Sequence, residues 1–399
     1  MIKVWKNYDR IPQEIKRSDA DVKHIFCGTF KSKKLQSDEK SIGNLETVRG
    51  ALRNLYHATC GYCEGKFPPY EVEHYRAQRA YETKHSAACE QHAGYAWLCQ
   101  EWSNLLYSCG ACNNAKSNKV PIQPLGVRVL EAPTQRAEWR ADSAPMQVEY
   151  PDLLNPELDV PEAHLYCRSN GEMGFSTARG EQTIKLCHLN RADLVLEGRK
   201  KIIDTFQRDV REALLNFDEG YGHGLPALSP QAFKQKLKDC FHPLIKRLIY
   251  HQLPWEPFSL LHWSMLHDME TFCISKFPKE VQQLFQKIMH LWRESQLTLE
   301  AEARVLMLQT NIPTILADFT HRHEQEAQRL SKERFSQDLK YSFIQIFYNF
   351  IFLLKGNRAQ LFCYIDALDY PIQRKLLKKA WKLCESDARW SFNPALQAE

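Results

Sequence analysis

The residues best suited to chemistry are two pairs of cysteines, each with two residues between its members. Cys60 and Cys63 form the first pair, and Cys109 and Cys112 form the second. Two intervening residues let both sulfurs of a turn face one ion, and two such turns complete a closed tetrahedral site. We expect Zn²⁺ in this site, with a structural role. The alternative is two unrelated pairs, one of them redox-active.

A second set of polar residues lies between the cysteine pairs and directly after them. The stretches are Glu71-Val72-Glu73-His74-Tyr75-Arg76, Trp102-Ser103-Asn104-Leu105-Leu106-Tyr107-Ser108 and Asn113-Asn114-Ala115-Lys116. Taken singly, a Glu-His pair in a strand is usually a solvated face, and an asparagine after a cysteine is usually a helix cap. Their order between two cysteine pairs favours one common site.

In this order the motifs resemble the HNH, or ββα-metal, nuclease motif in its zinc-knuckle variant. Three short sequences are similar to those of the HNH nucleases of Septu and retron anti-phage systems: Cys-Gly-Tyr-Cys-Glu, Glu-His-Tyr-Arg and Trp-Ser-Asn-Leu-Leu-Tyr-Ser-Cys. Three later stretches resemble the same group: residues 153–156, 161–165 and 189–191. The resemblance covers residues 50–200 and leaves the second half of the chain unexplained.

The resemblance implies a role for each matched residue. His74 matches the general base, and its ordinary pKa near neutrality suits that role. Glu73 and Asn113 match the ligands of a catalytic cation, and their oxygen donors imply Mg²⁺ or Mn²⁺. Glu73 stands where many such nucleases have Asp, and Asn114 and Asn118 compete with Asn113 as the last ligand.

Three further residues take supporting roles by the same resemblance. Asn104 matches the residue that supports the loop bearing the histidine. Lys116 and Arg76 match residues near the scissile phosphate, and so are expected to bind nucleic acid.

The implied activity is phosphodiester hydrolysis, of DNA in preference to RNA. The implied partner is an ABC-type ATPase, with a retron reverse transcriptase and its msDNA in some systems. The alternative is a zinc-stabilised module that binds nucleic acid or protein without catalysis.

The elements that must position these residues indicate an α+β protein. We expect a small zinc-knuckle ββα-metal module followed by a large all-α region. Tyr70–Tyr75 alternates as a strand, and Ser169-Asn170-Gly171 indicates a hairpin turn. The expected divisions are an N-terminal helical and basic segment, a nuclease core, a loop and hairpin extension, and a helical accessory domain, over residues 1–58, 59–125, 126–200 and 201–399.

The helical half carries no motif that names an activity. Its apolar stripes predict helices near residues 231–252, 259–276, 279–310, 312–335, 338–355 and 370–384. A basic cluster, Arg374, Lys375, Lys378, Lys379 and Lys382, has helical spacing and is either a solvated face or a contact for nucleic acid or an acidic partner. We expect this half to dock a partner protein or to restrain the nuclease.

Composition and charge limit the class of protein. The 399 residues are 44% hydrophobic and 25% charged, which is typical of a soluble globular protein. No signal sequence or membrane-spanning apolar run is visible, so we expect a cytoplasmic protein without disulfides or membrane contact. Residues 1–125 hold 18 basic and 13 acidic residues and carry the whole net charge of +5.

The nine remaining cysteines have no paired spacing. Cys89, Cys99, His92 and His85 are therefore not expected to form a second metal site. We expect the others to be small buried hydrophobic residues: Cys27, Cys167, Cys187, Cys240, Cys273, Cys363 and Cys384.

Overall fold

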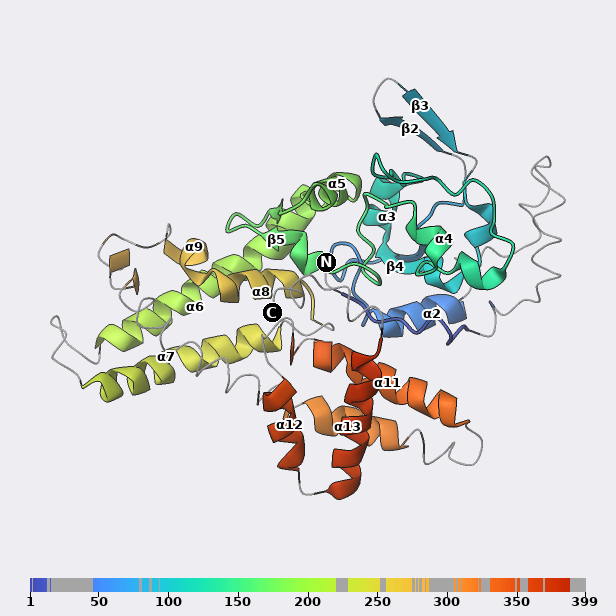
Figure 1. The fold of residues 1–399 in the computed structure, drawn as a ribbon. Helices are drawn as coiled ribbons and strands as arrows, with labels where there is room; N and C mark the ends of the chain where they lie inside the picture. Colours follow the sequence, from blue (N-terminus) through green and yellow to red (C-terminus); the bar gives the residue numbers. More distant parts are fainter. Residues whose placement is uncertain are drawn as a thin grey trace. The chain divides into compact units, whose positions relative to one another are not determined.

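The computed structural model forms two compact units, which are described separately (Figure 1). Unit 1 comprises Met1–Tyr166, Glu172–Gly198 and Pro254–Phe258, and unit 2 comprises the rest of the chain. The structure describes residues 1, 3–12, 15, 46–78, 81–85, 88–92, 94–219, 229–251, 256–274, 277, 279, 282–283, 285–286, 305, 308–309, 311–321, 323, 331–348, 350–351, 358–368 and 370–387. Cys27 and three basic residues of the N-terminal segment, Lys31, Lys33 and Lys34, lie outside this part.

The centre of unit 1 is a two-stranded antiparallel sheet followed by a helix. Strand β1 (Tyr70–His74) pairs with β4 (Leu105–Cys109), and α3 (Gly110–Lys116) follows β4 without a break. The register places Glu73 opposite Leu106 and His74 opposite Leu105. Helix α2 (Glu46–Leu55) contacts both strands, and its Val48 and Leu52 are buried as the spacing predicts.

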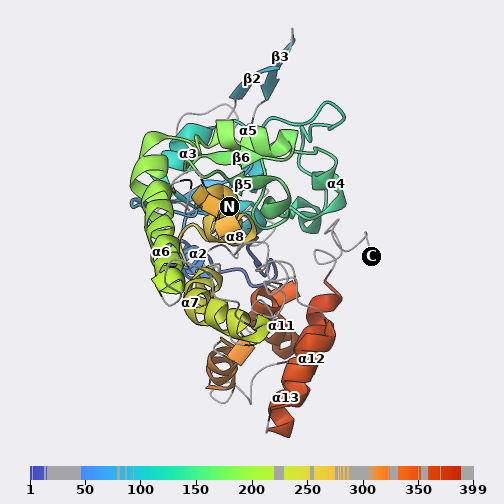
Figure 2. The ribbon, with the colours of Figure 1, turned by 90° about the vertical axis from the view of Figure 1, so that its left-hand side faces the viewer.

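The remainder of unit 1 surrounds this centre with short elements. Strands β2 (Tyr81–His85) and β3 (Ala88–His92) form a hairpin that projects from the unit (Figures 1 and 2). A second sheet joins β5 (Leu165–Cys167) and β6 (Met173–Phe175) around the predicted turn. Unit 1 also contains helices α4 (Ala144–Gln147) and α5 (Ala178–Leu186). A π-helical turn at Asp193–Arg199 follows α5.

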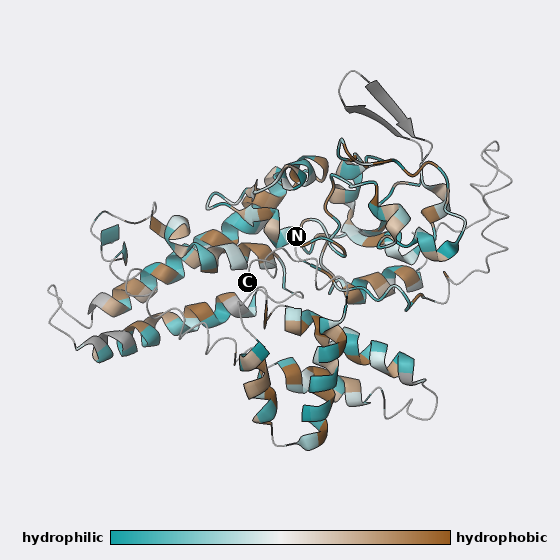
Figure 3. Cartoon of the chain, in the orientation of Figure 1, coloured by the Kyte–Doolittle hydropathy of each residue, from teal (hydrophilic) through white to brown (hydrophobic). Residues whose placement is uncertain are grey.

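Apart from Cys167 of β5, the regular secondary structure in the described part of unit 2 is helical. Its helices are α6 (Lys200–Glu219), α7 (Pro230–Tyr250), α8 (Ser259–His267), α9 (Met269–Cys273), α11 (Lys332–Tyr348), α12 (Arg358–Asp366) and α13 (Pro371–Glu385). Helix α6 runs beside α7, and α11 beside α13 (Figures 1 and 2). Figure 3 shows hydrophilic and hydrophobic residues alternating along these helices, as expected when one face is buried.

The predicted α+β class agrees with this mixture of many helices and small two-stranded sheets. Four helical predictions coincide with α7, α8 with α9, α11 and α13, whereas α5 and α12 were not predicted. Within the described helices, none is long and apolar enough to cross a bilayer. The expected burial of the scattered cysteines is wrong for Cys363, which is exposed, and for Cys240, which is only partly buried.

Candidate functional site: a cysteine cluster beside a strand–strand–helix unit

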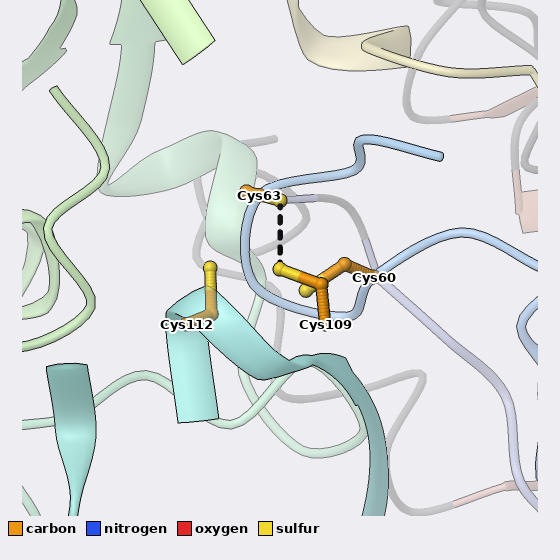
Figure 4. A group of neighbouring side chains, drawn as sticks. All are labelled: Cys60, Cys63, Cys109 and Cys112. Atoms are coloured by element: carbon orange, nitrogen blue, oxygen red, sulfur yellow. Dashed lines mark hydrogen bonds between the residues drawn. The ribbon is translucent and has the colours of Figure 1, made fainter. Parts of the chain in front are cut away.

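The four predicted cysteines converge in unit 1 (Figure 4). Their sulfurs all lie within 4.8 Å of one another, and all four residues are buried. Cys60 and Cys63 come from the loop after α2, Cys109 ends β4, and Cys112 lies in α3. Four thiols at this separation can bind one metal ion such as Zn²⁺. Among the described residues, no other group of three histidines, cysteines or carboxylates gathers in this way.

The loop of the first pair is fixed against β4 by its backbone. The amide of Gly61 donates to the Tyr107 carbonyl at 2.8 Å. A Cβ atom at Gly61 would lie 2.7 Å from the ring of Tyr56 and 3.3 Å from the same carbonyl oxygen. Only glycine permits this close approach without displacement of Tyr56. The sequence Cys-Gly-Tyr-Cys therefore positions both sulfurs relative to the strand.

An arginine approaches the cluster from the segment after α5. The guanidinium of Arg191 lies 3.2 Å from the sulfur of Cys112, 3.7 Å from that of Cys109 and 3.9 Å from that of Cys63. Asp193 accepts from the opposite side of the same group. Four thiolates around one divalent ion carry excess negative charge, and a neighbouring guanidinium offsets part of it.

Helix α3 faces β1 through two pairs of polar side chains. The amide of Asn113 donates to the carboxylate of Glu71. One helical turn later, Lys116 forms an ion pair with Glu73 at 2.5 Å. Glu71 and Glu73 are two residues apart on a strand and share a face, just as residues three apart share a face of a helix. The spacing of the two motifs therefore brings them into register.

Glu73 is an acid in a nearly dry environment. It is 3% exposed, and burial raises its pKa above the ordinary value, although the Lys116 ammonium opposes the shift. The same ammonium donates to the carbonyl of His74 at 2.8 Å. Lys116 is itself buried. A buried carboxylate that is paired with a cation can ligate a metal ion or lie next to a metal site.

His74 is held by the backbone of a neighbouring turn. Its Nε2 lies 3.0 Å from the carbonyl oxygen of Cys99. Because a carbonyl only accepts hydrogen bonds, Nε2 carries the hydrogen, and the lone pair of the neutral ring is then on Nδ1. Burial lowers the pKa of His74 to about 4; the hydrogen bond to Cys99 opposes this effect, whereas the charge of Lys116 adds to it.

Asn104 ties together the segment that follows His74. Its side-chain oxygen accepts from the amide of Arg76 at 2.8 Å, and its nitrogen donates to the Arg76 carbonyl at 3.0 Å. Its nitrogen also donates to the Leu98 carbonyl, and its backbone oxygen accepts from the amide of Tyr75 at 2.9 Å. The side chain is buried, so each of these bonds matters for the local backbone.

Arg76 differs from its predicted position near a phosphate. The residue is 1% exposed, and its guanidinium donates to Glu149 at 2.6 Å and to the carbonyl of Met146 at 2.8 Å. Arg76 therefore serves the core of unit 1, because its charge is neutralised by a buried partner. Lys116 is also paired and buried, so neither predicted phosphate contact presents a free cation in this structure.

Three residues of the site were not predicted: Glu71, Cys99 and Arg191. For Glu71 a signal was present, since it shares a strand face with Glu73. Asn113 meets Glu71, whereas Asn114 is exposed, which favours Asn113 among the three competing asparagines. The carbonyl of Cys99 depends on tertiary structure that no local pattern encodes, whereas Arg191 lies in the stretch of residues 189–191 that resembles the Septu and retron group.

Comparison with known proteins relates the chain to Septu proteins. It is 33% identical over 161 residues to the Septu protein PtuB of Bacillus mycoides (strain KBAB4), covering 39% of this chain and 50% of that protein. It is 27% identical over 158 residues to the Septu protein PtuA of the same strain, covering 39% of this chain and 20% of that protein. The chain thus matches half or less of the length of both.

A longer but weaker similarity connects the chain to a second PtuB. It is 23% identical over 270 residues to the Septu protein PtuB of Bacillus thuringiensis, covering 65% of this chain and 83% of that protein. No protein-family model and no solved structure matches the chain. The predicted resemblance to Septu proteins is confirmed at this level.

Proposed function

We propose that the chain is a metal-dependent endonuclease of the HNH type that acts in Septu anti-phage defence. The observation that carries the proposal is the arrangement of β1, β4 and α3 beside the cysteine cluster. Lys116 of α3 pairs with Glu73 and donates to the carbonyl of His74 at the end of β1, and Asn113 of the same helix donates to Glu71 of that strand. A base and oxygen ligands on a rigid unit are what hydrolysis of a phosphodiester requires.

In this proposal His74 is the general base and acts through Nδ1. Its Nε2 is engaged by Cys99, which fixes the ring and leaves Nδ1 to accept a proton from the attacking water. Asn104 positions this histidine by holding the backbone of the next two residues. Lys116 positions Glu73 and the His74 carbonyl rather than the phosphate.

A hard cation fits beside Glu73 and Asn113. Both side chains offer oxygen atoms from the facing sides of β1 and α3, and Glu71 adds a second carboxyl group, which accepts a hydrogen bond from Asn113. Mg²⁺ or Mn²⁺ prefers such ligands and would stabilise the negative charge that develops on the phosphate. Zn²⁺ at the cysteine cluster would instead hold the first cysteine loop and α3 together.

The Septu relatives support two parts of this proposal, a defence role and a PtuA-type partner. The chain is similar to both PtuB and PtuA, which carry the name of one system. We propose that an ABC-type ATPase of the PtuA type binds this chain and controls cleavage. Nucleic acid is the proposed substrate, with DNA favoured over RNA.

The test is cleavage by the purified full chain, with and without the PtuA-type partner, in Mg²⁺ or Mn²⁺. Duplex DNA, single strands and tRNA serve as substrates. We expect His74→Ala to lower the rate by about a hundred- to ten-thousand-fold while zinc content and melting temperature stay unchanged. His57→Ala is the matched control, because His57 is an exposed histidine of the same unit. Wild-type rates in His74→Ala would refute the assignment, and binding without any cleavage would favour the non-catalytic alternative.

A further inference from the structure

A basic pocket lies in unit 2, formed by α12 and α13. Its volume is about 620 Å³, and the described residues that line it are Asp366, Arg374, Lys375, Lys378, Lys379 and Lys382. Asp366 ends α12, and the five cations belong to α13. A concave surface with five cations and one carboxylate attracts anions more strongly than the same charges on a convex surface would.

Three lysines of this pocket, Lys375, Lys379 and Lys382, are exposed and lie away from the buried residues of α13. Leu377, Ala380, Trp381 and Cys384 are buried, and the helix packs against α11 and α12 through this side. Figure 3 shows the corresponding alternation of hydrophilic and hydrophobic residues in the helix. Packing therefore fixes the orientation of the helix and leaves its cationic face available to a ligand.

The acidic residue of the pocket neutralises only part of this charge. Asp366 forms an ion pair with Lys378 at 2.5 Å. Within the part of the chain that the structure describes, Lys375, Lys379 and Lys382 form no ion pair with a carboxylate, although Lys379 lies over an aromatic ring of α11. A solvated helix face usually mixes both signs of charge, whereas this face holds three cations without an acid.

The spacing of these three lysines fits a phosphate backbone. Positions 375, 379 and 382 are four and three residues apart, so they form one stripe about 10 Å long. The three ammonium groups therefore stand in a row along which one strand can place successive phosphates. Tyr370 precedes it by about one turn and is 66% exposed, which provides a ring on which a base can stack.

We propose that the pocket of α12 and α13 binds the sugar-phosphate backbone of single-stranded nucleic acid. Lys375, Lys379 and Lys382 contact successive phosphates, and Tyr370 stacks on a base. Single-stranded DNA and RNA share this chemistry. The proposal does not depend on the proposed nuclease function, because it uses only residues of unit 2 and requires no catalytic metal.

The experiment measures binding by the full chain without added Mg²⁺ or Mn²⁺. Fluorescence anisotropy follows labelled single-stranded DNA and RNA oligonucleotides, matched duplexes, and polyglutamate over a range of salt concentrations. The test variant combines Lys375→Gln, Lys379→Gln and Lys382→Gln. The control variant combines Arg208→Gln, Arg211→Gln and Lys246→Gln, which removes the same charge from exposed positions of α6 and α7.

We expect the test variant to bind single strands at least tenfold more weakly than the control variant. The slope of log affinity against log salt should fall by about 2, because each phosphate contact contributes about 0.7 in a single strand. Tyr370→Ala should weaken binding by about fivefold or more. The single variant Lys375→Gln should show a partial loss, and it keeps the test informative if the triple variant loses its fold.

Equal affinities of the test and control variants would overturn the proposal. Tighter binding of polyglutamate than of either oligonucleotide would also overturn it in favour of an acidic protein partner. The measurements are repeated in the His74→Ala background. Retention of the lysine-dependent binding there, whether or not that variant cleaves, separates the pocket from the proposed nuclease site.

Discussion

The site residues of unit 1 are linked mainly by bonds to backbone atoms. His74 contacts a carbonyl oxygen, Lys116 donates to another, and Asn104 bonds both backbone groups of Arg76. Such bonds define where a side chain points more strictly than a contact between two flexible side chains does. The positions of these side chains therefore depend on individual donor and acceptor atoms. Variants that remove one donor or acceptor are informative for this reason.

The two asparagines are expected to respond differently to metal. Asn113→Ala removes one proposed oxygen ligand and leaves the base in place, so cleavage should fall and be partly restored by high Mn²⁺. Asn104→Ala leaves the Arg76 carbonyl without its donor, so cleavage should fall without restoration by metal. Cleavage rates over a series of Mn²⁺ concentrations measure both. Equal rescue of both variants would contradict the division of roles.

Arg191 should control how tightly the cysteine cluster holds its metal. We expect Arg191→Ala to raise the rate of zinc release by about ten- to a hundredfold, because it removes a guanidinium beside three sulfurs. Arg191→Lys should give an intermediate rate, since it keeps the charge and loses the fork of donors. Zinc release to a chromogenic chelator is the measurement. Cys109→Ser, which removes a ligand, should abolish stoichiometric zinc; unchanged release from Arg191→Ala would contradict the role.

Sequence patterns predicted that the four cysteines cluster, but not which groups the neighbouring polar side chains contact. The paired spacing of the cysteines was sufficient to identify the cluster, because four sulfurs at such spacing have few other arrangements. The partner of Arg76 was beyond prediction, since Glu149 lies 73 residues away and no local pattern joins them. An arginine in a motif looks the same in the sequence whether its partner is a substrate or a residue of the core.

At the scale of elements, the buried Lys6 anchors the segment of residues 3–12 through a hydrogen bond to β4 and an ion pair with Glu157. The ammonium of Lys6 donates to the Leu105 carbonyl at 2.5 Å and lies 3.2 Å from Glu157. Tyr56 in the turn after α2 donates to the same carboxylate. Burial raises the pKa of Glu157, whereas Lys6 and Tyr56 favour its charged form. One carboxylate thus connects three segments that are distant in sequence.

Lys6→Met should destabilise unit 1 in a pH-dependent manner. Loss of one partner from a buried pair costs about 3–5 kcal/mol. A carboxyl group whose pKa is raised in the folded state contributes most below its unfolded pKa, and this contribution is lost as the pH rises through the folded pKa. Removal of Lys6 raises that pKa further, so the free energy lost should be larger at pH 7.5 than at pH 5. Denaturant titrations at both values, with Lys200→Met as control, measure this, and a loss independent of pH would contradict it.

The elements themselves were predictable where periodicity was long. Helices α7 and α13 have apolar stripes over several turns, and each was expected close to its observed bounds, whereas α11 begins six residues before the predicted 338–355. Helix α12 was missed because its nine residues, Arg358–Asp366, have no strong amphipathic pattern and bury only Leu361 and Ile365. Helix α5 was missed because it lies among turn-forming residues that favoured a loop.

At the scale of the whole molecule, the chain passes between the two units more than once. It leaves unit 1 after Gly198 and returns for Pro254–Phe258. Phe258 is 6% exposed and its ring lies 6.2 Å from that of Phe67, while its amide donates to the carbonyl of Glu64 close to Cys63. Residues of the second half of the sequence therefore complete the unit that holds the candidate site.

The helical half is expected to bind the PtuA-type partner without contributing to the chemistry of cleavage. A chain that ends at residue 258 keeps all of unit 1 but loses most of unit 2. It should therefore retain its zinc and fail to co-purify with the partner. A chain that ends at residue 220 should lose the partner and should also melt at a lower temperature, since it lacks Phe258. Full partner binding by the chain of 258 residues would contradict this prediction.

The return of the chain to unit 1 also sets an order of events during synthesis. When residue 198 leaves the ribosome, all four cysteines, Arg191 and every proposed catalytic residue have been made. Phe258 appears 60 residues later, which corresponds to about 3–12 s of translation at about 5–20 residues per second. Unit 1 therefore acquires its last packing residue only after α6 and α7 have been made. A newly made chain thus contains helices α6 and α7 of unit 2 before its proposed cutting site is fully built.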